Sequence, residues 1–334
     1  MTSSPPVTLA AVDGLSEDFA ERARFEDWAR LFALADLADL GDTDAWAAEE
    51  LRVALRNPDK RYAGLAALDG RGSVVGAAEM IMQVRDNTHL VILNLAVHPD
   101  HRRRGIGSLL LARVEELTRE HGRRTIIVET AWLPGGNDGS GTFAGRHGFS
   151  GEQTLRRSDF PVTDALPAPQ MPMGYALETH VGTPPESLAE DRALLNRRMS
   201  TDAPFGDLEL EEEDWDTERI HGLDARAEQM GRGRVSAFVR DLASGRLAGF
   251  TEIQIPQTAT DLAYQHDTLV LREHRGHGLG LALKLAAAAV LRDAYPLVRT
   301  VRTWNATENE HMLAVNDALG YVPSGFVREW QKRL

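Results

Sequence analysis

Two short glycine-containing motifs are the residues of this sequence whose types and spacing most clearly suggest chemistry. Arg102-Arg103-Arg104-Gly105-Ile106-Gly107 and Arg275-Gly276-His277-Gly278-Leu279-Gly280 share the form R-x-x-G-x-G, and each lies between an expected strand and an expected helix. The first N–H groups of a helix lack partners within the helix and lie at the positive end of its dipole. Because glycine lets an anion approach the backbone closely, each motif predicts a diphosphate site, with Arg102 and Arg275 orienting the loop and adding positive charge.

Neither motif fits the two best-known nucleotide-binding patterns. A P-loop requires G-x-x-x-x-G-K-[ST], which neither copy has. A Rossmann fingerprint requires G-x-G-x-x-G after a first parallel strand, whereas these glycines follow the third of several strands that we expect to be antiparallel. The remaining alternative is a helix start that contains glycine and binds nothing. Two copies in register make that alternative less favourable.

The spacing of further landmarks indicates an internal repeat. The two glycine motifs lie 173 residues apart, and the same offset separates Gly76-Ala77-Ala78-Glu79 from Gly249-Phe250-Thr251-Glu252. Downstream, His147-Gly148-Phe149 and Leu319-Gly320-Tyr321 lie 172 residues apart. Landmarks that keep register through both halves predict two copies of one fold.

The repeat divides the chain into two domains with the same expected order of elements. We place them at residues 1–160 and 174–334, joined by a proline-containing linker at 161–173. The expected fold class is α/β (α+β), with a mixed, mostly antiparallel sheet flanked by helices in each domain. In the first domain we predict strands at 7–11, 62–68, 74–84, 89–97 and 126–128 and helices at 16–40, 43–56 and from the glycine motif to 120, with Ser16 and Thr43 as N-caps. In the second we predict strands at 175–179, 235–240, 247–255, 264–271, 298–303 and 326–330 and helices at 185–198, 215–230, 279–291 and 311–319.

The strand before the second glycine motif carries the candidate acid–base residues. It contains Tyr264, His266 and Asp267, whereas the corresponding strand of the first half has only Asn94 as a polar residue after His89. Strand alternation places Tyr264, His266 and Thr268 on one face and Gln265 and Asp267 on the other. The second domain is therefore the favoured catalytic half, and the first is expected to be non-catalytic. The alternative is that His266 and Asp267 are hydrogen-bonded structural residues.

Glu252 on the neighbouring expected strand is a further candidate, with Glu79 as its counterpart in the first half. A carboxylate in the middle of such a strand needs a partner or solvent. Three roles are open for Glu252: general base, clamp for an acceptor amine, or structural anchor kept from a duplicated ancestor.

Composition limits the class of protein. The chain has 334 residues, a formal net charge of −13 and no cysteine, which argues against nucleic acid as a partner and excludes disulfides, thiolate metal sites and a thiol nucleophile. No segment matches the roughly 18 uncharged apolar residues of a membrane helix, since the longest candidate, 279–291, contains Lys284. No signal peptide is visible, so we expect a cytoplasmic protein without a membrane partner or a metal.

At these motifs the chain resembles the GCN5-related N-acetyltransferase (GNAT) family. Val97–Leu110 is similar to the family's acetyl-CoA motif, and Val270–Gly280 is a second instance of it. His147-Gly148-Phe149 and Leu319-Gly320-Tyr321 resemble the L-G-F sequence that follows the family's last helix. The resemblance covers both halves, in a layout similar to two-domain bacterial members such as mycothiol synthase. It implies acetyl-CoA or CoA as cofactor, bound where two neighbouring strands splay apart.

The resemblance also implies roles for residues of this sequence. Cofactor-binding roles fall on the strand ends, the glycine motifs and one asparagine: Leu95, Ala96, Val97, Arg102, Arg103, Arg104, Gly105, Ile106, Gly107, Ser108, Leu269, Val270, Leu271, Arg275, Gly276, His277, Gly278, Leu279, Gly280 and Asn305. The family reaction is direct attack of an amine on the thioester, which requires a base for the amine; Asp267, His266 or Glu252 would serve.

One departure from the family bears on the acid. Many members have a tyrosine four residues before the L-G-F glycine, but here that position holds Asn316 and Ala144. Tyr264 or water would then protonate the thiolate. The expected function is acyl-CoA-dependent N-acetyl transfer to the amine of a small molecule, by a monomer or homodimer. The alternatives are a CoA-binding sensor without turnover and an acyltransferase for protein or peptide N-termini.

Overall fold

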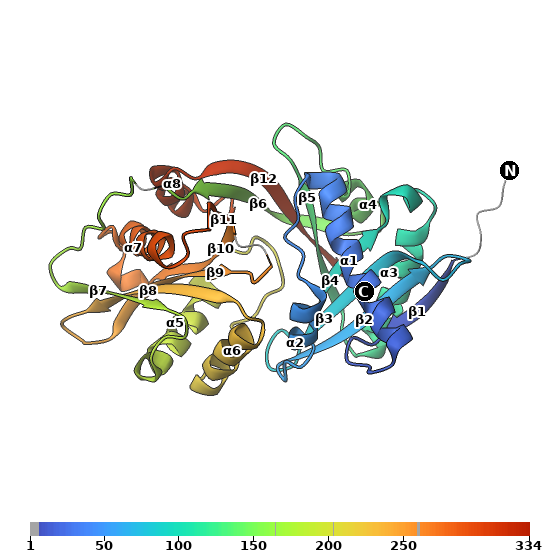
Figure 1. The fold of residues 1–334 in the computed structure, drawn as a ribbon, viewed down its shortest axis with the longest axis horizontal. Coiled ribbons are helices and arrows are strands. Elements are labelled where there is room, and N and C mark those ends of the chain that lie inside the picture. Colours follow the sequence, from blue (N-terminus) through green and yellow to red (C-terminus); the bar gives the residue numbers. More distant parts are fainter. Residues whose placement is uncertain (1–6, 164, 203, 259–260) are drawn as a thin grey trace. The chain divides into compact units, whose positions relative to one another are not determined.

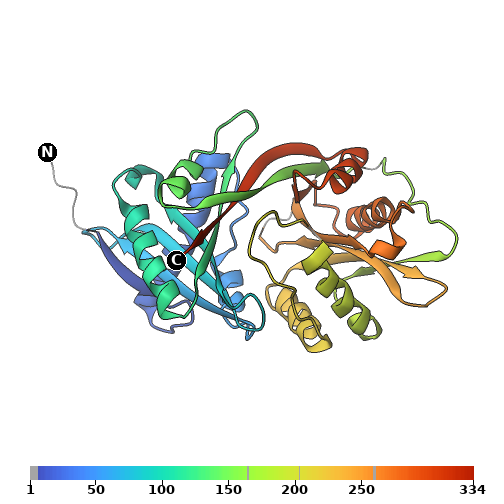
Figure 2. The same cartoon turned by 180° about the vertical axis from the view of Figure 1, so that it is seen from behind.

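The structure, a computed structural model, describes residues 7–163, 165–202, 204–258 and 261–334 and contains two compact units (Figure 1). One unit comprises the described residues up to Thr154 together with Val327–Leu334, and the other comprises Leu155–Phe326. The final strand, β12 (Val322–Arg333), therefore contributes to both units, and its last part returns to the N-terminal one (Figure 2). Within the described residues, no helix combines the length and the apolar character that crossing a membrane requires.

In the N-terminal unit the strands follow the order β1-β2-β3-β4-β5-β12. All pairs from β1 to β4 are antiparallel, and β4 and β5 are parallel. The strands are β1 (Thr8–Val12), β2 (Lys60–Leu68), β3 (Val74–Gln83), β4 (Leu90–Val97) and β5 (Thr125–Trp132). The helices are α1 (Phe19–Leu40), α2 (Ala48–Ala54), α3 (Ile106–Glu120) and α4 (Gly141–Arg146), with a 3-10 turn at Pro99–His101.

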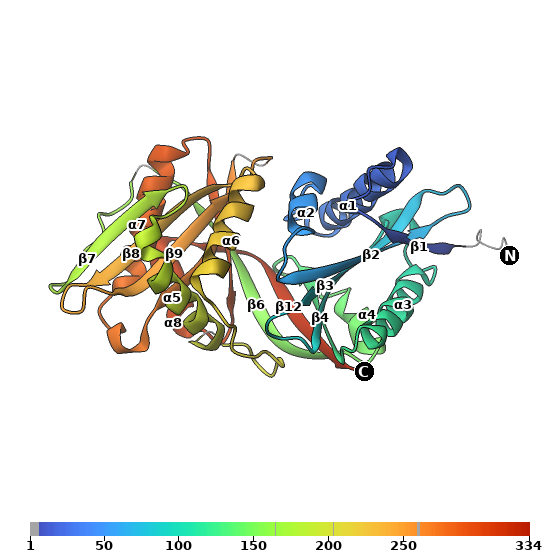
Figure 3. The same cartoon turned by 90° about the horizontal axis from the view of Figure 1, so that it is seen from below.

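Helices cover both faces of this sheet, because successive strand residues point to opposite faces. Leu65 and Ala67 of β2 pack in one core cluster with Leu110 and Val114 of α3. Ala66, between them, belongs to a second cluster with Phe25 and Trp28 of α1. Figure 3 shows α1 and α2 on one side of the sheet and α3 and α4 on the other.

The second unit repeats this plan with the strand order β6-β11-β10-β9-β8-β7. The parallel pair is β10 with β11, and β6 joins β11 antiparallel through residues 155–161. Helix α7 packs on one face of the sheet and α5 on the opposite one, each over its own apolar cluster (Figure 1). The strands are β6 (Ser150–Pro161), β7 (Tyr175–Val181), β8 (Gly233–Asp241), β9 (Leu247–Ile255), β10 (Leu262–Val270) and β11 (Thr300–Ala306); the helices are α5 (Ala189–Asp202), α6 (Thr217–Gln229), α7 (Leu279–Ala294) and α8 (Glu310–Leu319), with 3-10 turns at Glu186–Leu188 and Arg272–His274.

In both units the two parallel strands separate part-way along their length. Pairing of β4 with β5 runs from Leu90 to Leu93, although β4 continues to Val97. Pairing of β10 with β11 runs from Leu262 to Tyr264, although β10 continues to Val270. Each unit therefore has two diverging strand ends beside the glycine motif that follows its β4 or β10.

The predicted elements occur in the predicted order, but the structure adds α4 and β6, which were not predicted, and several boundaries differ. The predicted N-caps Ser16 and Thr43 are wrong: Asp18 caps α1, and α2 begins after Ala47. The long strand β6 was not predicted, and the closing strand is longer than 326–330. Both β6 and β12 carry many charged and polar residues, which weakens the apolar pattern that identifies a strand.

Replacing Asp18 with alanine is expected to destabilise the N-terminal unit by about 1 kcal/mol. The Asp18 carboxylate accepts hydrogen bonds from the N–H groups of Ala20 and Glu21, at 2.9 and 3.0 Å. Urea unfolding would measure the loss. Ser16→Ala is the control, because the Ser16 hydroxyl accepts a hydrogen bond from Asp18 N at 3.2 Å but none from the N–H groups of the helix, and an equal loss in both variants would contradict the assignment.

Candidate functional site

The two glycine loops have the same backbone form. Gly105 and Gly278 are the N-cap residues of α3 and α7, both with a left-handed φ, of 83° and 71°. At neither helix start does a capping side chain accept a hydrogen bond from the backbone N–H groups, whereas the side chains of Asp18, Asp216 and Asn309 do so for α1, α6 and α8. The N–H groups of α3 and α7 therefore remain available to an anion.

The first arginine of each motif holds its loop in the same way. Arg102 Nε donates to Val97 O at 3.1 Å, and Arg275 Nε donates to Val270 O at 3.0 Å. Each guanidinium also pairs with an aspartate near the end of a helix, Arg102 with Asp39 and Arg275 with Asp202. Each arginine is therefore fixed against its own loop, and its charge is paired with a carboxylate of the same unit.

The other motif positions show where the copies differ. Arg103 has a φ of 62°, at the position where the second copy has Gly276 with a φ of 83°. A Cβ atom added to Gly280 would meet nothing within 4 Å, whereas one added to Gly107 would touch the Phe143 ring at 3.4 Å. Ser108 Oγ lies 3.0 Å from His147 Nε2. A pocket of about 280 Å³ includes Arg104, Gly105 and Ile106 in its lining. In the first turn of the helix the second loop therefore has more space around Gly280 than the first has around Gly107, although this pocket lies at the first loop.

A β-bulge changes the expected arrangement on β10. Gln265 pairs with Ile253 and Thr268 with Thr251, so both His266 and Asp267 lie opposite Glu252. The predicted alternation is wrong for Thr268, which lies on the face of Gln265 and not with Tyr264. Gln265 Nε2 donates to Thr251 Oγ1 at 2.9 Å, and the hydroxyls of Thr251 and Thr268 are 2.6 Å apart.

The bulge brings three of the predicted catalytic residues to one place. The side chains of His266 and Asp267 both reach solvent, but the surrounding protein removes part of their hydration. This desolvation, with the negative charges of Glu252 and Glu213, raises the pKa of Asp267 to about 6. Desolvation also lowers the pKa of His266, although Glu252 opposes this effect. At neutral pH the Asp267 carboxyl is therefore mostly ionised and can accept a proton.

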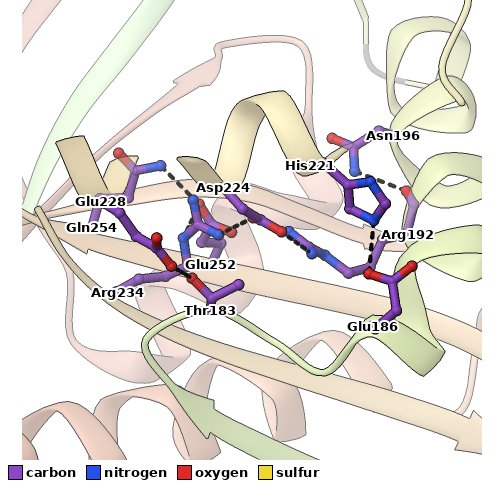
Figure 4. Close-up of polar contacts among 10 residues, drawn as sticks. All are labelled: Thr183, Glu186, Arg192, Asn196, His221, Asp224, Glu228, Arg234, Glu252 and Gln254. Carbon is purple, nitrogen blue, oxygen red and sulfur yellow. Dashed lines mark hydrogen bonds and ion pairs between the residues drawn. The ribbon is translucent and has the colours of Figure 1, made fainter. Parts of the chain in front are cut away.

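Glu252 is held by an ion-pair network that Figure 4 shows. Gln254 Nε2 donates to its Oε1 at 2.8 Å, and Arg234 Nε lies 3.5 Å from the same oxygen. Arg234 also binds Asp224, which Arg192 contacts with two hydrogen bonds of 2.7 Å. Although burial opposes it, the two guanidinium groups lower the pKa of Asp224. These contacts anchor the Glu252 carboxylate, which suits a fixed negative charge beside Asp267.

Arg192 and Asp224 also line a second pocket of about 220 Å³, which lies between α5, α6 and the segment 183–186 that precedes α5. His221 and Glu186, in contact at 2.7 Å, complete its rim (Figure 4). The sequence reasoning missed this buried charge network, because nothing in the spacing of Arg192, Asp224 and Arg234 indicates that they meet.

The remaining predicted residues lie along the diverging strands. Tyr264 is the last residue of β10 paired with β11, and its ring stacks on Trp304 with centroids 5.9 Å apart. Leu269 and Leu271 pack toward α5, whereas Val270 and Leu279 pack toward the α7 side. Leu95, Ala96 and Val97 form the end of β4, paired with β3. Asn305 Oδ1 accepts from Asn316 Nδ2 at 2.6 Å.

The described residues contain no group of three or more His, Cys, Asp or Glu side chains placed to hold a metal ion. The candidate site combines an uncapped helix start, two diverging strands and the acid–base groups of a bulge.

Comparison with known proteins identifies the family. The pattern of the Acetyltransferase (GNAT) family matches residues 23–149 and 200–321. Two curated relatives are named mycothiol acetyltransferase: that of Thermobispora bispora is 32% identical over 60% of this chain and 62% of its own length, and that of Salinispora tropica is 27% identical over 90% of both.

Solved structures agree with the two-unit arrangement. A tandem GNAT protein from the clavulanic acid biosynthesis pathway superposes with a TM-score of 0.82 at 28% identity, over 98% of both chains. A GCN5-related N-acetyltransferase from Sphaerobacter thermophilus, with a TM-score of 0.70 and 19% identity over 99% of this chain and 97% of its own, shares the fold. The predicted fold class and resemblance are confirmed, and the chain belongs to the acetyltransferase (GNAT) family, with two GNAT domains in tandem.

Proposed function

We propose that this protein transfers an acetyl group from acetyl-CoA to the primary amine of a small molecule, and that the Leu155–Phe326 unit carries the reaction. The observation that supports this most strongly is the β10 bulge, which places His266 and Asp267 opposite Glu252 next to the diverging strands and the open glycine loop. The names of the curated relatives support a small-molecule acceptor.

The residues present fit acyl-CoA at the second loop. The N–H groups at the start of α7, with Gly278 and Gly280 leaving the backbone bare, would hold the diphosphate. The end of β10, from Leu269 to Leu271, would hold the pantetheine arm. Acetyl-CoA supplies the acyl group as an activated thioester.

Residues at the bulge of β10 would carry out the proton transfer. Asp267 takes a proton from the attacking amine, because its raised pKa makes it a stronger base than an ordinary carboxylate. Glu252, anchored by Gln254 and Arg234, keeps a negative charge beside it and attracts the cationic form of an amine. The first unit offers Asn94 and a buried Glu79 at the matching places, bonded to each other at 2.8 Å, so we propose that it does not catalyse transfer.

The test is release of thiol from acetyl-CoA with a panel of small amines and of peptides with a free N-terminus, together with the melting temperature with and without CoA. We expect acetyl-CoA-dependent release that a small amine accelerates. If CoA raises the melting temperature and no acceptor increases release above hydrolysis, the protein is a CoA sensor. Acceleration by peptides alone would replace the small-molecule acceptor with a peptide one.

A further inference from the structure

Three polar side chains from three elements form a short chain beneath the proposed reaction site. Lys284 of α7 donates from Nζ to Asn316 Oδ1 at 2.8 Å, and Asn316 of α8 donates from Nδ2 to Asn305 Oδ1 at 2.6 Å. Lys284 is 3% exposed and Asn316 is fully buried, whereas Asn305, on β11, is half-buried. The chain therefore runs from the apolar interior of the unit toward its surface.

The hydrogen bonds of this chain all run in one direction. Lys284 donates to the amide oxygen of Asn316, so the amide nitrogen of Asn316 faces Asn305 and donates to it. The oxygen of Asn305 is thereby used as an acceptor. Its Nδ2 has no hydrogen-bond acceptor among the residues that the structure describes, so both of its N–H groups are left to donate outward.

Asn305 lies where such a donor would meet the acyl group. Pairing of β11 with β10 ends at Arg302, so Asn305 is three residues into the divergence of the two strands. The first unit has no such chain, because the positions that match Lys284, Asn305 and Asn316 by the repeat offset are Leu111, Trp132 and Ala144. The polar chain is thus specific to the unit that carries the bulge.

Burying Lys284 in the apolar interior lowers the stability of the fold, because the amine loses its contact with water. Its Nζ lies 5.3 Å from the centroid of the Tyr321 ring, and the described residues include no carboxylate in contact with it. Burial lowers the pKa of Lys284 to about 7. A buried lysine whose hydrogen bond is to an amide contributes little to stability, because no attraction to an opposite charge offsets the free energy of its desolvation.

We propose that Lys284 and Asn316 are positioning residues that fix the Asn305 amide as a hydrogen-bond donor to the thioester end of the acyl-CoA. This inference rests on the proposed function. In the transfer, the C–N bond forms as the C–S bond breaks, and the sulfur leaves with the electron pair. The amine proton goes to Asp267, and the sulfur takes its proton from solvent. Asn305 keeps its own protons and stabilises the negative charge that develops, at the step for which this chain lacks the family tyrosine.

Asn316→Asp is the most specific test, because aspartate has the shape of asparagine but its carboxylate only accepts hydrogen bonds. The new carboxylate accepts from Lys284 but cannot donate to Asn305, so the Asn305 amide must turn its nitrogen inward and its oxygen toward the substrate. We expect kcat to fall about 100-fold, at the lower end of the range for losing one such donor, with the KM for acetyl-CoA changed less than about threefold. Asp317→Asn, at the exposed neighbour that pairs with Arg156, is the matched control and should leave both constants unchanged.

Lys284→Met tests the same inference without turnover. Methionine fills a similar volume but cannot donate, so the Asn316 amide is free to reorient. In protein labelled with ¹⁵N at asparagine, and without any ligand, the side-chain N–H of Asn316 should exchange with solvent at least tenfold faster in Lys284→Met, because the buried amide has lost the donor that fixes it. The kcat of this variant should fall about tenfold.

The outcomes separate the two proposals. If the wild-type protein acetylates an amine but Asn316→Asp keeps its kcat, or changes KM and kcat together, the positioning role is overturned and the proposed function stands. Unchanged exchange of the Asn316 amide in Lys284→Met also overturns the positioning role. If the wild-type protein acetylates no acceptor, both proposals fail.

Discussion

Replacing Asp267 with asparagine is expected to lower kcat by a factor of about 100 to 10,000, the usual range for losing a general base. Asparagine has the same shape and cannot take a proton from the attacking amine. The structure favours Asp267 over its neighbours, because Glu252 is already bonded to Gln254 and paired with Arg234. Steady-state kinetics with a saturating amine acceptor would measure the loss.

The pH profile gives the sharper form of this prediction. A general base acts in its ionised form, so the rate of the wild-type protein should rise with pH through about 6, the raised pKa of Asp267. This limb should be absent from Asp267→Asn. The expected effect on stability has the opposite sign: a carboxyl whose pKa is higher in the folded state favours folding when protonated, so its contribution is lost as the pH rises from about 4 to about 6. At pH 8 the variant should therefore melt no lower than the wild-type protein.

His266→Gln and Glu252→Gln serve as comparisons for Asp267→Asn. His266 is exposed at the same bulge and its pKa is lowered, so it is the competing base. If His266→Gln removed the limb of the pH profile and Asp267→Asn kept it, the assignment would pass to the histidine. A loss in Glu252→Gln that appears in KM for the amine, with kcat little changed, would mark Glu252 as the amine clamp.

The fold was predictable from the sequence because the same local sequence signals occur in both halves of the chain. Glycine motifs, turn residues and apolar periodicity recur at a nearly constant offset, so one copy supports the interpretation of the other. The limits lie where no local signal exists. Strands β6 and β12 have mixed, polar faces, and the membership of Val327–Leu334 in the N-terminal unit depends on contacts between residues far apart in the sequence.

The candidate site was predictable in composition but not in geometry. His266, Asp267 and Glu252 stand out by type, but strict alternation placed Thr268 on the wrong face, because a bulge inserts a residue without a sequence signature. Lys284 was visible as the single charge within the apolar stretch 279–291, yet its partner Asn316 comes from another helix. A lone lysine in an apolar stretch is a signal that such a partner exists, and only the fold identifies it.

Gly280→Asp is expected to weaken CoA binding by about 100-fold while leaving the protein as stable as before. Gly280 lies in the first turn of α7, and a Cβ there would meet nothing within 4 Å, so the fold accepts the side chain. A carboxylate in the first turn favours the helix dipole, and replacing glycine removes its helix penalty. In contrast, two like charges about 4 Å apart repel by roughly 1 to 4 kcal/mol near a protein surface, which opposes a diphosphate at the same N–H groups.

Gly107→Asp is the matched control for this variant, since Gly107 occupies the same place in α3 and its Cβ would make only ordinary contact with Phe143. Calorimetric titration with CoA would compare the two. If the second unit alone holds the coenzyme, Gly280→Asp abolishes the measurable binding and Gly107→Asp leaves the Kd unchanged; if both units bind, each variant removes one of two sites. An unchanged Kd and stoichiometry in both variants would show that neither helix start receives the diphosphate, and the proposed acetyl transfer would then lose its cofactor site.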